Sequence, residues 1–480
     1  MKRPEILLAV AASLVDPRVA KIDLDVTLDP EHGTLRETAS LSVAARGVAH
    51  LTFAIDEGLV VKTARASSGV IEHRQAGSEL IVDVDPPIDG ERTLTFAIAG
   101  QPRPKTETEI SAQRAILAPS SSWYPTLPGT WAASAVTIRV PAGWGAAASG
   151  TPTARTAAGV FRFTNDKPVR TIAVAAAPGL KSADGTLAAV PFRMAAVASA
   201  VPVKSFTPRL TPAMAWLSGA LAPYAFEGFQ LVTLPGYTGR VSASGIAIVG
   251  GPLQLATDAD GADLLAGQWF GEALPGDGAW IEAFAAWEAC VFARDRGLPI
   301  PREIARLRGA YFQLLSGDVA LSKAQATAPE EVIRGKGSAA PDMVRLVAGD
   351  RAMFDAIREL FAAPAGAPLT LRDLRAVLER HAQRPLERAF TEWFERPGAP
   401  EIAAELRSFP ASSGGFRADI RLTQKRGIYA LPVDLIIHGA GESHRETVEL
   451  DDETTSVFYV VPFEPTRIEI DPLNRLFRWK

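Results

Sequence analysis

The chain has 480 residues, of which 47% are hydrophobic and 22% are charged, and its formal net charge is −4. This length and composition predict two to four globular domains. No long basic block is present, which argues against nucleic acid as a partner, and no apolar run reaches the roughly 18 residues of a membrane span. Cys290 is the single cysteine, which excludes an internal disulfide and a cysteine zinc site.

The N-terminal segment, residues 1–20, has the residue order of a secretory signal. Lys2 and Arg3 precede a short apolar run at residues 6–15. Glu5 and Asp16 flank this run, so an ordinary first helix or strand fits the same pattern. The sequence therefore leaves open whether the protein belongs to the cell envelope or periplasm, or to the cytoplasm.

Residues 21–202 are predicted to form an N-terminal antiparallel β domain, a sandwich or a saddle. Residues 22–28 are apolar at every second position, as expected for a half-buried strand, and residues 29–33 are typical of a turn. Further short strands are predicted at residues 41–45, 51–55, 80–84, 93–97 and 137–140. Regular spacing of this kind is typical of antiparallel sheets.

Residues 203–408 are predicted to form a mainly helical central domain, because the hydrophobic period lengthens after Phe206. Helices are predicted at residues 208–221, 343–347, 352–361 and, from a capping box, 370–381. Trp280, Phe284 and Trp287 recur at helical spacing, which is typical of a buried helix face.

Residues 412–480 return to short alternating segments and predict a small C-terminal β sandwich. The predicted strands are at residues 416–422, 430–437, 446–450, 455–461 and 467–470. The whole chain is thus expected to be a multidomain α+β protein.

Two motifs in residues 262–288 resemble the centre of the aminopeptidase N-like zinc peptidases, the gluzincin aminopeptidases. Gln268-Trp269-Phe270-Gly271 matches the end of that family's H-E-x-x-H-Q-W-[FW]-G helix, and residues 282–285 are close to the E-G-F-A of its next helix. The resemblance implies a thermolysin-like central domain with these motifs on two neighbouring helices. In the family, both histidines and the glutamate of the second helix bind a catalytic zinc.

Weaker motifs extend the resemblance over most of the chain as an order of domains. Residues 121–125 and 136–144 resemble the family's first domain, and residues 224–235 resemble a short strand of its central domain. Residues 398–400 resemble the end of its last helix pair, and residues 468–478 resemble the terminal strand of a small β domain in bacterial relatives.

The family's functional residues are missing at the matching positions. Asp263 and Gly267 stand where the family has its two histidines, and Leu264 replaces the glutamate that acts on the metal-bound water. Glu282 alone remains, at the third ligand position, and Arg334 replaces the tyrosine that stabilises the oxyanion. These five residues are expected to form a vestigial cleft with no zinc, no other cofactor and no catalytic residue.

The leading hypothesis is therefore a non-catalytic aminopeptidase-like protein that binds a peptide or protein partner, or serves as a scaffold, through the retained cleft and the β domains. Residues 240–252 also lack the family's Met-Glu-Asn loop, which binds the substrate amine. The alternative is a hydrolase of the metallopeptidase family that uses a rearranged site made of Asp263, Glu282 and Arg334. A third possibility is an unrelated cleft for a small molecule.

Arg334 is also hypothesised to pair with Glu282, directly or through water, since a buried carboxylate that has lost its metal needs another cation. The alternative is that Arg334 is a solvent-facing loop residue. Two other groups were considered as metal sites. Asp258, Asp260 and Asp263 favour the N-terminal cap of a helix over a weak Ca²⁺ or Mg²⁺ site. The turn histidines at positions 438 and 444 are more typical of solvated side chains than of metal ligands.

Overall fold

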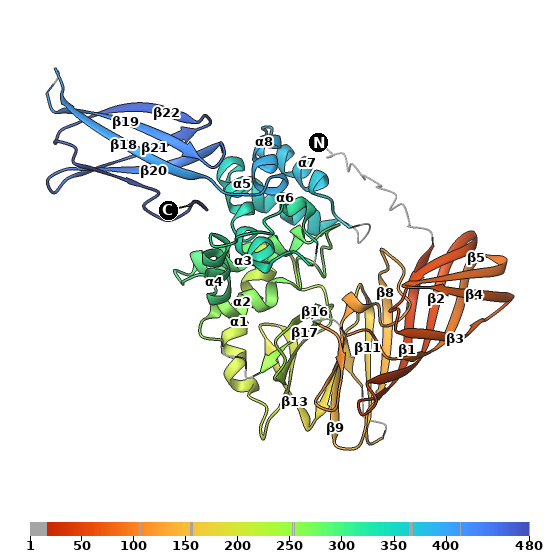
Figure 1. Ribbon diagram of the computed structural model, residues 1–480. Helices are drawn as coiled ribbons and strands as arrows, with labels where there is room; N and C mark the ends of the chain where they lie inside the picture. Colours follow the sequence, from red (N-terminus) through yellow and green to blue (C-terminus); the bar gives the residue numbers. More distant parts are fainter. Residues whose placement is uncertain are drawn as a thin grey trace, which may run out of the picture. The chain divides into compact units, whose positions relative to one another are not determined.

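The computed structural model describes residues 17–104, 107–153, 157–251, 253, 255–325, 327–363, 368–412 and 414–479. The possible signal within residues 1–20 therefore lies mostly outside the described residues. The chain divides into two compact units: Met1–Ala256 with Ala363–Pro368, and Thr257–Ala362 with Leu369–Lys480 (Figure 1). Within the described ranges, no helix is long and apolar enough to cross a membrane.

The first unit begins with an eight-stranded sheet in the order β10-β11-β8-β1-β2-β5-β3, and β4 also pairs with β5. Its strands are β1 (Arg18–Asp29), β2 (Thr34–Ala54), β3 (Leu59–Ala66), β4 (Val70–Ala76), β5 (Glu79–Gly100), β8 (Ala132–Arg139), β10 (Thr151–Pro152) and β11 (Val160–Val169). The pairing is antiparallel except between β1 and β8, which run parallel. This parallel pair departs from the purely antiparallel sheet that was predicted.

Two strands of this sheet are longer than the sequence pattern predicts. Residues 41–45 and 51–55 belong to the single strand β2, and residues 80–84 and 93–97 belong to β5. The register between β2 and β5 shifts between Arg46 and Val48 and again between Val48 and His50. Such a bulge changes the phase of the inward and outward alternation without ending the strand. The sequence therefore shows two short strands where the fold has one.

Two further sheets complete the first unit. One has the order β6-β7-β12-β9 and the other β13-β14-β15-β17-β16. Their elements are β6 (Glu109–Ile110), β7 (Ala115–Leu117), β9 (Trp144–Ala148), β12 (Val174–Pro178), β13 (Leu180–Leu187), β14 (Val190–Val197), α1 (Val203–Ala220), β15 (Phe229–Pro235), β16 (Arg240–Ala243) and β17 (Ile246–Gly251). Ile116, Ala175, Val232 and Ile248 belong to one buried apolar cluster that draws on both sheets.

The second unit begins with helices, and those at residues 340–348, 350–362 and 371–382 overlap predicted segments, whereas the helix at residues 302–311 was not predicted. The helix predicted at residues 208–221 lies in the first unit, as α1. The helices of the second unit are α2 (Asp258–Ala266), α3 (Trp280–Asp295), α4 (Arg302–Tyr311), α5 (Ala340–Ala348), α6 (Asp350–Ala362), α7 (Leu371–Ala382) and α8 (Glu387–Phe390), with π-helical turns at η3 (Glu331–Lys336) and η4 (Thr391–Glu395). α2 and α3 pack against each other, which confirms the two neighbouring helices predicted around residues 262–288. The capping box of α7 is also present, since the backbone N–H of Asp373 donates to Thr370 Oγ1 at 3.1 Å.

The second unit ends in two three-stranded sheets, β18-β19-β22 and β21-β20-β23. Five of these strands coincide with predicted ones: β19 (Phe416–Lys425), β20 (Leu431–His438), β21 (Ser443–Leu450), β22 (Thr454–Val461) and β23 (Arg467–Ile470). The sixth, β18 (Glu401–Pro410), was not predicted, and it pairs with β19 along its whole length. The division into domains at residues 202 and 408 stays a prediction.

Candidate functional site

The first helix of the candidate site, α2, is held at its N-terminus by a capping box. Thr257 Oγ1 accepts a hydrogen bond from the backbone N–H of Asp260 at 3.3 Å, and Asp260 Oδ2 accepts one from the backbone N–H of Thr257 at 3.0 Å. The other oxygen of Asp260 accepts from the backbone N–H of Arg302 at 3.1 Å. These bonds confirm the capping role for Asp260, the central member of the predicted acidic cluster, whose carboxylate is used by backbone donors.

The end of α2 lies earlier than the family motif suggests. The helix stops at Ala266, Gly267 is its C-cap, and Gln268, Trp269 and Phe270 form the turn that follows. Their exposed fractions are 1%, 1% and 3%, so the matching motif is part of the core. Glycine is a poor helix former, and its presence at this position favours an early end to the helix.

The second helix, α3, presents its aromatic side chains to the core and its first acidic residue to solvent. Trp280, Phe284 and Trp287 are at most 2% exposed, and their rings make edge-to-face contacts. This confirms their interpretation as core residues. Trp287 Nε1 donates to Asp342 Oδ1 at 3.1 Å. Glu282, in the first turn of the same helix, is exposed.

Arg334 is part of the π-helical turn η3, which packs on α3 and α4. Its Nη2 donates to Asp263 Oδ1 at 2.5 Å, and the two side chains are only 13% and 11% exposed. Burial by itself would lower the pKa of Arg334, but the charge and the hydrogen bond of Asp263 outweigh burial and raise it. Both partners therefore remain charged, as a buried ion pair.

The bonded partner of Arg334 differs from the predicted one. The sequence predicts Glu282, whereas the structure places Asp263 against the guanidinium. Glu282 also raises the pKa of Arg334, but its effect is smaller than those of Asp263 and of Glu330, whose carboxylate lies 3.9 Å from Nη1. The reason is geometric, because Asp263 lies on the inward face of α2 while Glu282 is exposed.

Comparison with proteins of known structure shows which fold this chain shares. No protein-family model and no curated protein sequence matches the chain. An M1 zinc metallopeptidase from Deinococcus radiodurans matches with a TM-score of 0.66 and 21% identity, over 80% of this chain and 94% of that one. A mutant of that protein, solved with a Tyr-Ser-Ala substrate, gives the same TM-score and identity.

A larger protein matches more of the chain. Legionella pneumophila aminopeptidase A, in complex with aspartic acid, gives a TM-score of 0.75 at 14% identity, over 95% of this chain and 58% of that one. The chain has the M1 zinc metallopeptidase fold. At these identities the likeness concerns the fold alone.

The side chains at the metal positions of the M1 fold do not fit a zinc ion here. A catalytic zinc needs three protein ligands and an open position. Asp263 is already bonded to a guanidinium, Gly267 has no side chain, and Leu264 is apolar and 5% exposed. Over the part of the chain that the structure describes, no group of three His, Cys, Asp or Glu is placed to hold a metal.

The two histidines of the C-terminal turn have separate partners. His438 Nε2 lies 3.0 Å from Glu469 Oε2, and His444 Nε2 lies 2.7 Å from Glu446 Oε1. Each ring therefore pairs with a carboxylate of its own sheet region, and the two do not form a common site. The rings are thus paired with carboxylates, whereas the sequence predicted solvated side chains.

Two residues of acidic or basic type, Glu288 and Lys336, are fully buried in the second unit, and no role was assigned to either from the sequence. Glu288 on α3 is 0% exposed, and neither carboxylate oxygen has a hydrogen-bond partner among the described residues. Burial raises its pKa well above the ordinary 4.5, with the charge of Asp295 adding to the effect. Lys336 is also 0% exposed, its Nζ donates to the carbonyl of Arg396 at 2.6 Å, and burial lowers its pKa to about 8.

The sequence alone contains a pattern that indicates the burial of Glu288. It is the only charged residue between Ala283 and Ala293, a stretch that is otherwise apolar. A lone acid in such a run indicates a buried carboxyl group, since no face of the helix is polar enough to leave it in water.

Proposed function

We propose that this protein is a non-catalytic relative of the M1 zinc metallopeptidases, in which a buried ion pair takes the place of the catalytic zinc. The observation that carries the proposal is the bond between Arg334 and Asp263. By the sequence match, it joins the position of the family's first zinc-binding histidine to that of its catalytic tyrosine. A guanidinium already bonded to Asp263 repels a second cation at the same carboxylate.

The neighbouring positions support the same proposal. Leu264 is buried and has no group that accepts a proton, so the position of the general base is chemically inert. Gly267 supplies no ligand, and Glu282 alone does not make a catalytic zinc site. A rearranged hydrolase would need Asp263, Glu282 and Arg334 to be available for substrate, whereas two of them are bonded to each other.

We further propose that the ligand is a peptide or protein partner, which the protein binds without cleaving it. The support is the shared fold with a metallopeptidase that was solved with a Tyr-Ser-Ala substrate. The predicted β domains at residues 21–202 and 412–480 would then add partner or scaffold surfaces to the helical part at residues 203–408.

Elemental analysis combined with an aminopeptidase assay tests the loss of catalysis. The purified protein is expected to hold far less than one zinc per chain and to hydrolyse none of a panel of chromogenic aminoacyl substrates. The matched positive control restores Asp263→His, Leu264→Glu, Gly267→His and Arg334→Tyr together, and it is expected to gain zinc. Stoichiometric zinc in the wild type that is lost in Asp263→Ala or Glu282→Gln, with turnover, would favour the hydrolase.

Calorimetric titration with short peptides tests the binding role. Tyr-Ser-Ala is a suitable first probe, and mass spectrometry of the same sample shows whether it stays intact. We expect binding with no cleavage after prolonged incubation. Cleavage would contradict the non-catalytic proposal, and the absence of binding by this and a wider peptide set would contradict the peptide-binding role.

A further inference from the structure

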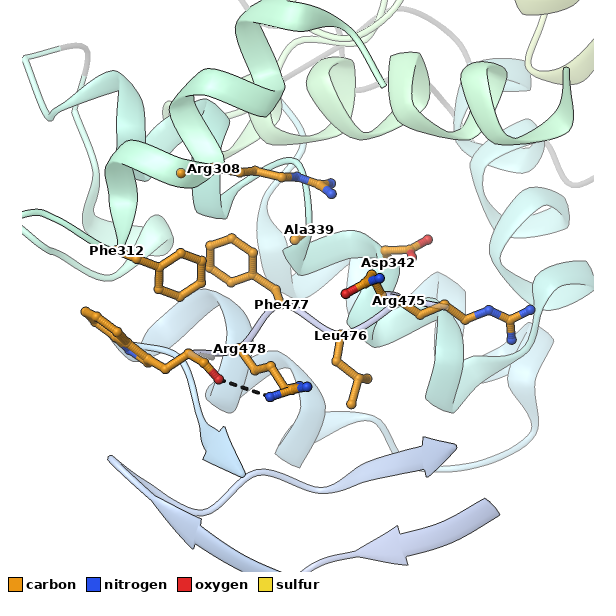
Figure 2. Close-up of a pocket in the computed structure, with 11 residues that line it drawn as sticks. Arg308, Phe312, Ala339, Asp342, Arg475, Leu476, Phe477 and Arg478 are labelled. Carbon is orange, nitrogen blue, oxygen red and sulfur yellow. Dashed lines mark hydrogen bonds between the residues drawn. The ribbon is translucent and has the colours of Figure 1, made fainter. Parts of the chain in front are cut away.

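The second unit contains a pocket of about 460 Å³ that the proposed function does not use (Figure 2). It lies between α4, the region at the start of α5, and the C-terminal segment around Phe477. Its volume falls in the range of small-molecule sites in proteins. None of the five residues of the vestigial zinc site lines it.

One wall of the pocket consists of aromatic rings that hold each other in place. The rings of Phe312 and Phe477 lie 4.8 Å apart between centroids, and those of Phe312 and Trp479 lie 5.0 Å apart. Tyr311 packs on Phe477 from behind, at 5.2 Å. Figure 2 shows the rings of Phe312 and Phe477 side by side in the pocket. The ring planes of Phe312 and Phe477 are inclined by 34° and those of Phe312 and Trp479 by 72°, so a planar apolar ligand can lie on one ring face and meet the edge of another.

Arg308 supplies a fixed positive charge to the same pocket. Its Nε donates to Ser338 Oγ at 2.8 Å, and its Nη2 donates to the carbonyl of Ser338 at 2.9 Å and lies 3.6 Å from Cys290 Sγ. These partners are all neutral. Among the residues that the structure describes, no carboxylate lies within 4.0 Å of this guanidinium. Arg308 is thus half-buried and oriented, with no counter-charge of its own.

The one acid of the pocket lining does not offset this charge. Asp342 Oδ1 accepts hydrogen bonds from Arg345 Nε at 2.8 Å and from Arg294 Nη1 at 3.1 Å. Two other guanidinium groups therefore already neutralise it. Arg478, a further lining residue, donates to the carbonyls of Trp479 and Ile470, both at 3.2 Å, and its Nε lies 3.9 Å from Asp471 Oδ2, so its charge is also compensated. The excess positive charge beside the apolar wall therefore comes from Arg308.

We propose that this pocket binds a small molecule with a planar apolar body and a carboxylate or similar anionic group. The body lies on the wall formed by Phe312, Phe477 and Trp479, and the anion pairs with Arg308. A charge-assisted hydrogen bond to a half-buried guanidinium is stronger than one between neutral groups. The proposal does not depend on whether the zinc site is catalytic.

Calorimetric titration of the full chain with naphthalene-2-carboxylate, and with 2-naphthalenemethanol as a neutral analogue, tests the proposal. The carboxylate is expected to bind at least about tenfold more tightly than the alcohol. Arg308→Met should remove about tenfold of the carboxylate affinity and leave the alcohol unchanged. Arg306→Met, on the same helix but bonded to Glu303, is the matched control and should change neither.

A second variant fills the pocket without removing a bond. A Cβ atom at Gly309 meets nothing within 4 Å, so Gly309→Leu should fold, and its side chain should exclude both compounds. Gly219→Leu in α1 also enters open space and serves as its control. Equal affinity for the two compounds, full binding in Gly309→Leu, or no binding at about 1 mM ligand would each overturn the proposal. If Arg308→Met fails to fold, the comparison of the two compounds and the Gly309→Leu variant still test the proposal.

Discussion

Asp263 and Arg334 form a nearly buried ion pair at positions that the sequence resemblance matches to a zinc ligand and the catalytic tyrosine of the zinc peptidases. The two side chains are 11% and 13% exposed, so each charge is compensated mainly by the other, and Glu330 lies 3.9 Å from Arg334 as a further acid. A buried pair of this kind contributes little compared with apolar residues of the same volume, but the loss of one partner leaves an uncompensated charge. The effect of the pair on stability is therefore best measured as the coupling free energy between Asp263 and Arg334.

A double-mutant cycle measures that coupling. Arg334→Met is expected to lower the free energy of unfolding by about 3 kcal/mol, because it leaves Asp263 charged and buried. Adding Asp263→Leu should recover most of that loss. The control cycle combines Arg334→Met with Glu282→Gln, whose effects should add to within about 0.5 kcal/mol. Urea denaturation gives each value, and additive effects at Asp263 and Arg334 would show that the ion pair is not the stabilising contact.

Glu288 is expected to make stability depend on pH. Its pKa is raised in the folded protein above the 4.5 that it has when exposed, so the native state keeps a proton that the unfolded state releases. The free energy of unfolding should then fall as the pH rises above about 4.5, by up to about 1.4 kcal/mol per pH unit for one proton. Glu288→Gln should remove this part of the slope between pH 5 and 8. An unchanged slope would mean that Glu288 is ionised in the folded protein.

At the scale of single elements, α2 depends on its first turn more than on its length. It is nine residues long, begins with a capping box and ends at a glycine. Short helices are marginal by themselves, so caps and packing decide whether they form. Because α2 carries Asp263, the cap at Thr257 also helps to position the ion pair with Arg334.

Thr257→Ala is expected to lower stability by about 1 kcal/mol, since it removes the side chain that accepts from the backbone N–H of Asp260. Thr257→Ser keeps a hydroxyl and should cost much less. Thr370→Ala, at the equivalent cap of α7, is the matched control for a helix that carries no residue of the site. Hydrogen exchange should show faster opening of α2 only in Thr257→Ala. Equal exchange in all three variants would argue that packing alone holds α2.

At the scale of the whole molecule, the chain consists of two compact units that each have a core and a buried, unpartnered glutamate. Glu37 is 3% exposed in the first unit, and Glu288 is 0% exposed in the second. For both, neither carboxylate oxygen has a hydrogen-bond partner among the described residues. Burial raises the pKa of each carboxyl, so a substitution at either glutamate should change the stability of the unit in which it lies.

Calorimetry of thermal unfolding should resolve two transitions, since multi-unit proteins with separate cores depart from two-state behaviour. Glu37→Gln is expected to move one transition to higher temperature at pH 8, and Glu288→Gln the other, because each removes the cost of burying an acid. A single transition that both substitutions shift equally would show that the two units unfold together.

The sequence by itself determined which side-chain types stand at the positions matched to the zinc site. Whether a position can donate to zinc depends only on side-chain type, so Gly267 and Leu264 exclude ligation without any knowledge of the fold. The alternation of strands, the aromatic spacing on α3 and the capping box of α7 are local patterns, and they predicted many of the elements. The fold of the M1 metallopeptidases was implied by the resemblance at residues 268–271 and 282–285. Where a bulge shifted the phase of β2, the local pattern misplaced the strand ends.

Only the tertiary structure decided which charged groups meet. Asp263 and Arg334 are 71 positions apart, and the choice of Asp263 over Glu282 depends on which face of each helix turns inward. The same holds for the pocket at Arg308, whose wall comes from α4 and from the end of the chain. Burial and ion pairing are properties of packed neighbours, and those neighbours come from segments that no local period connects.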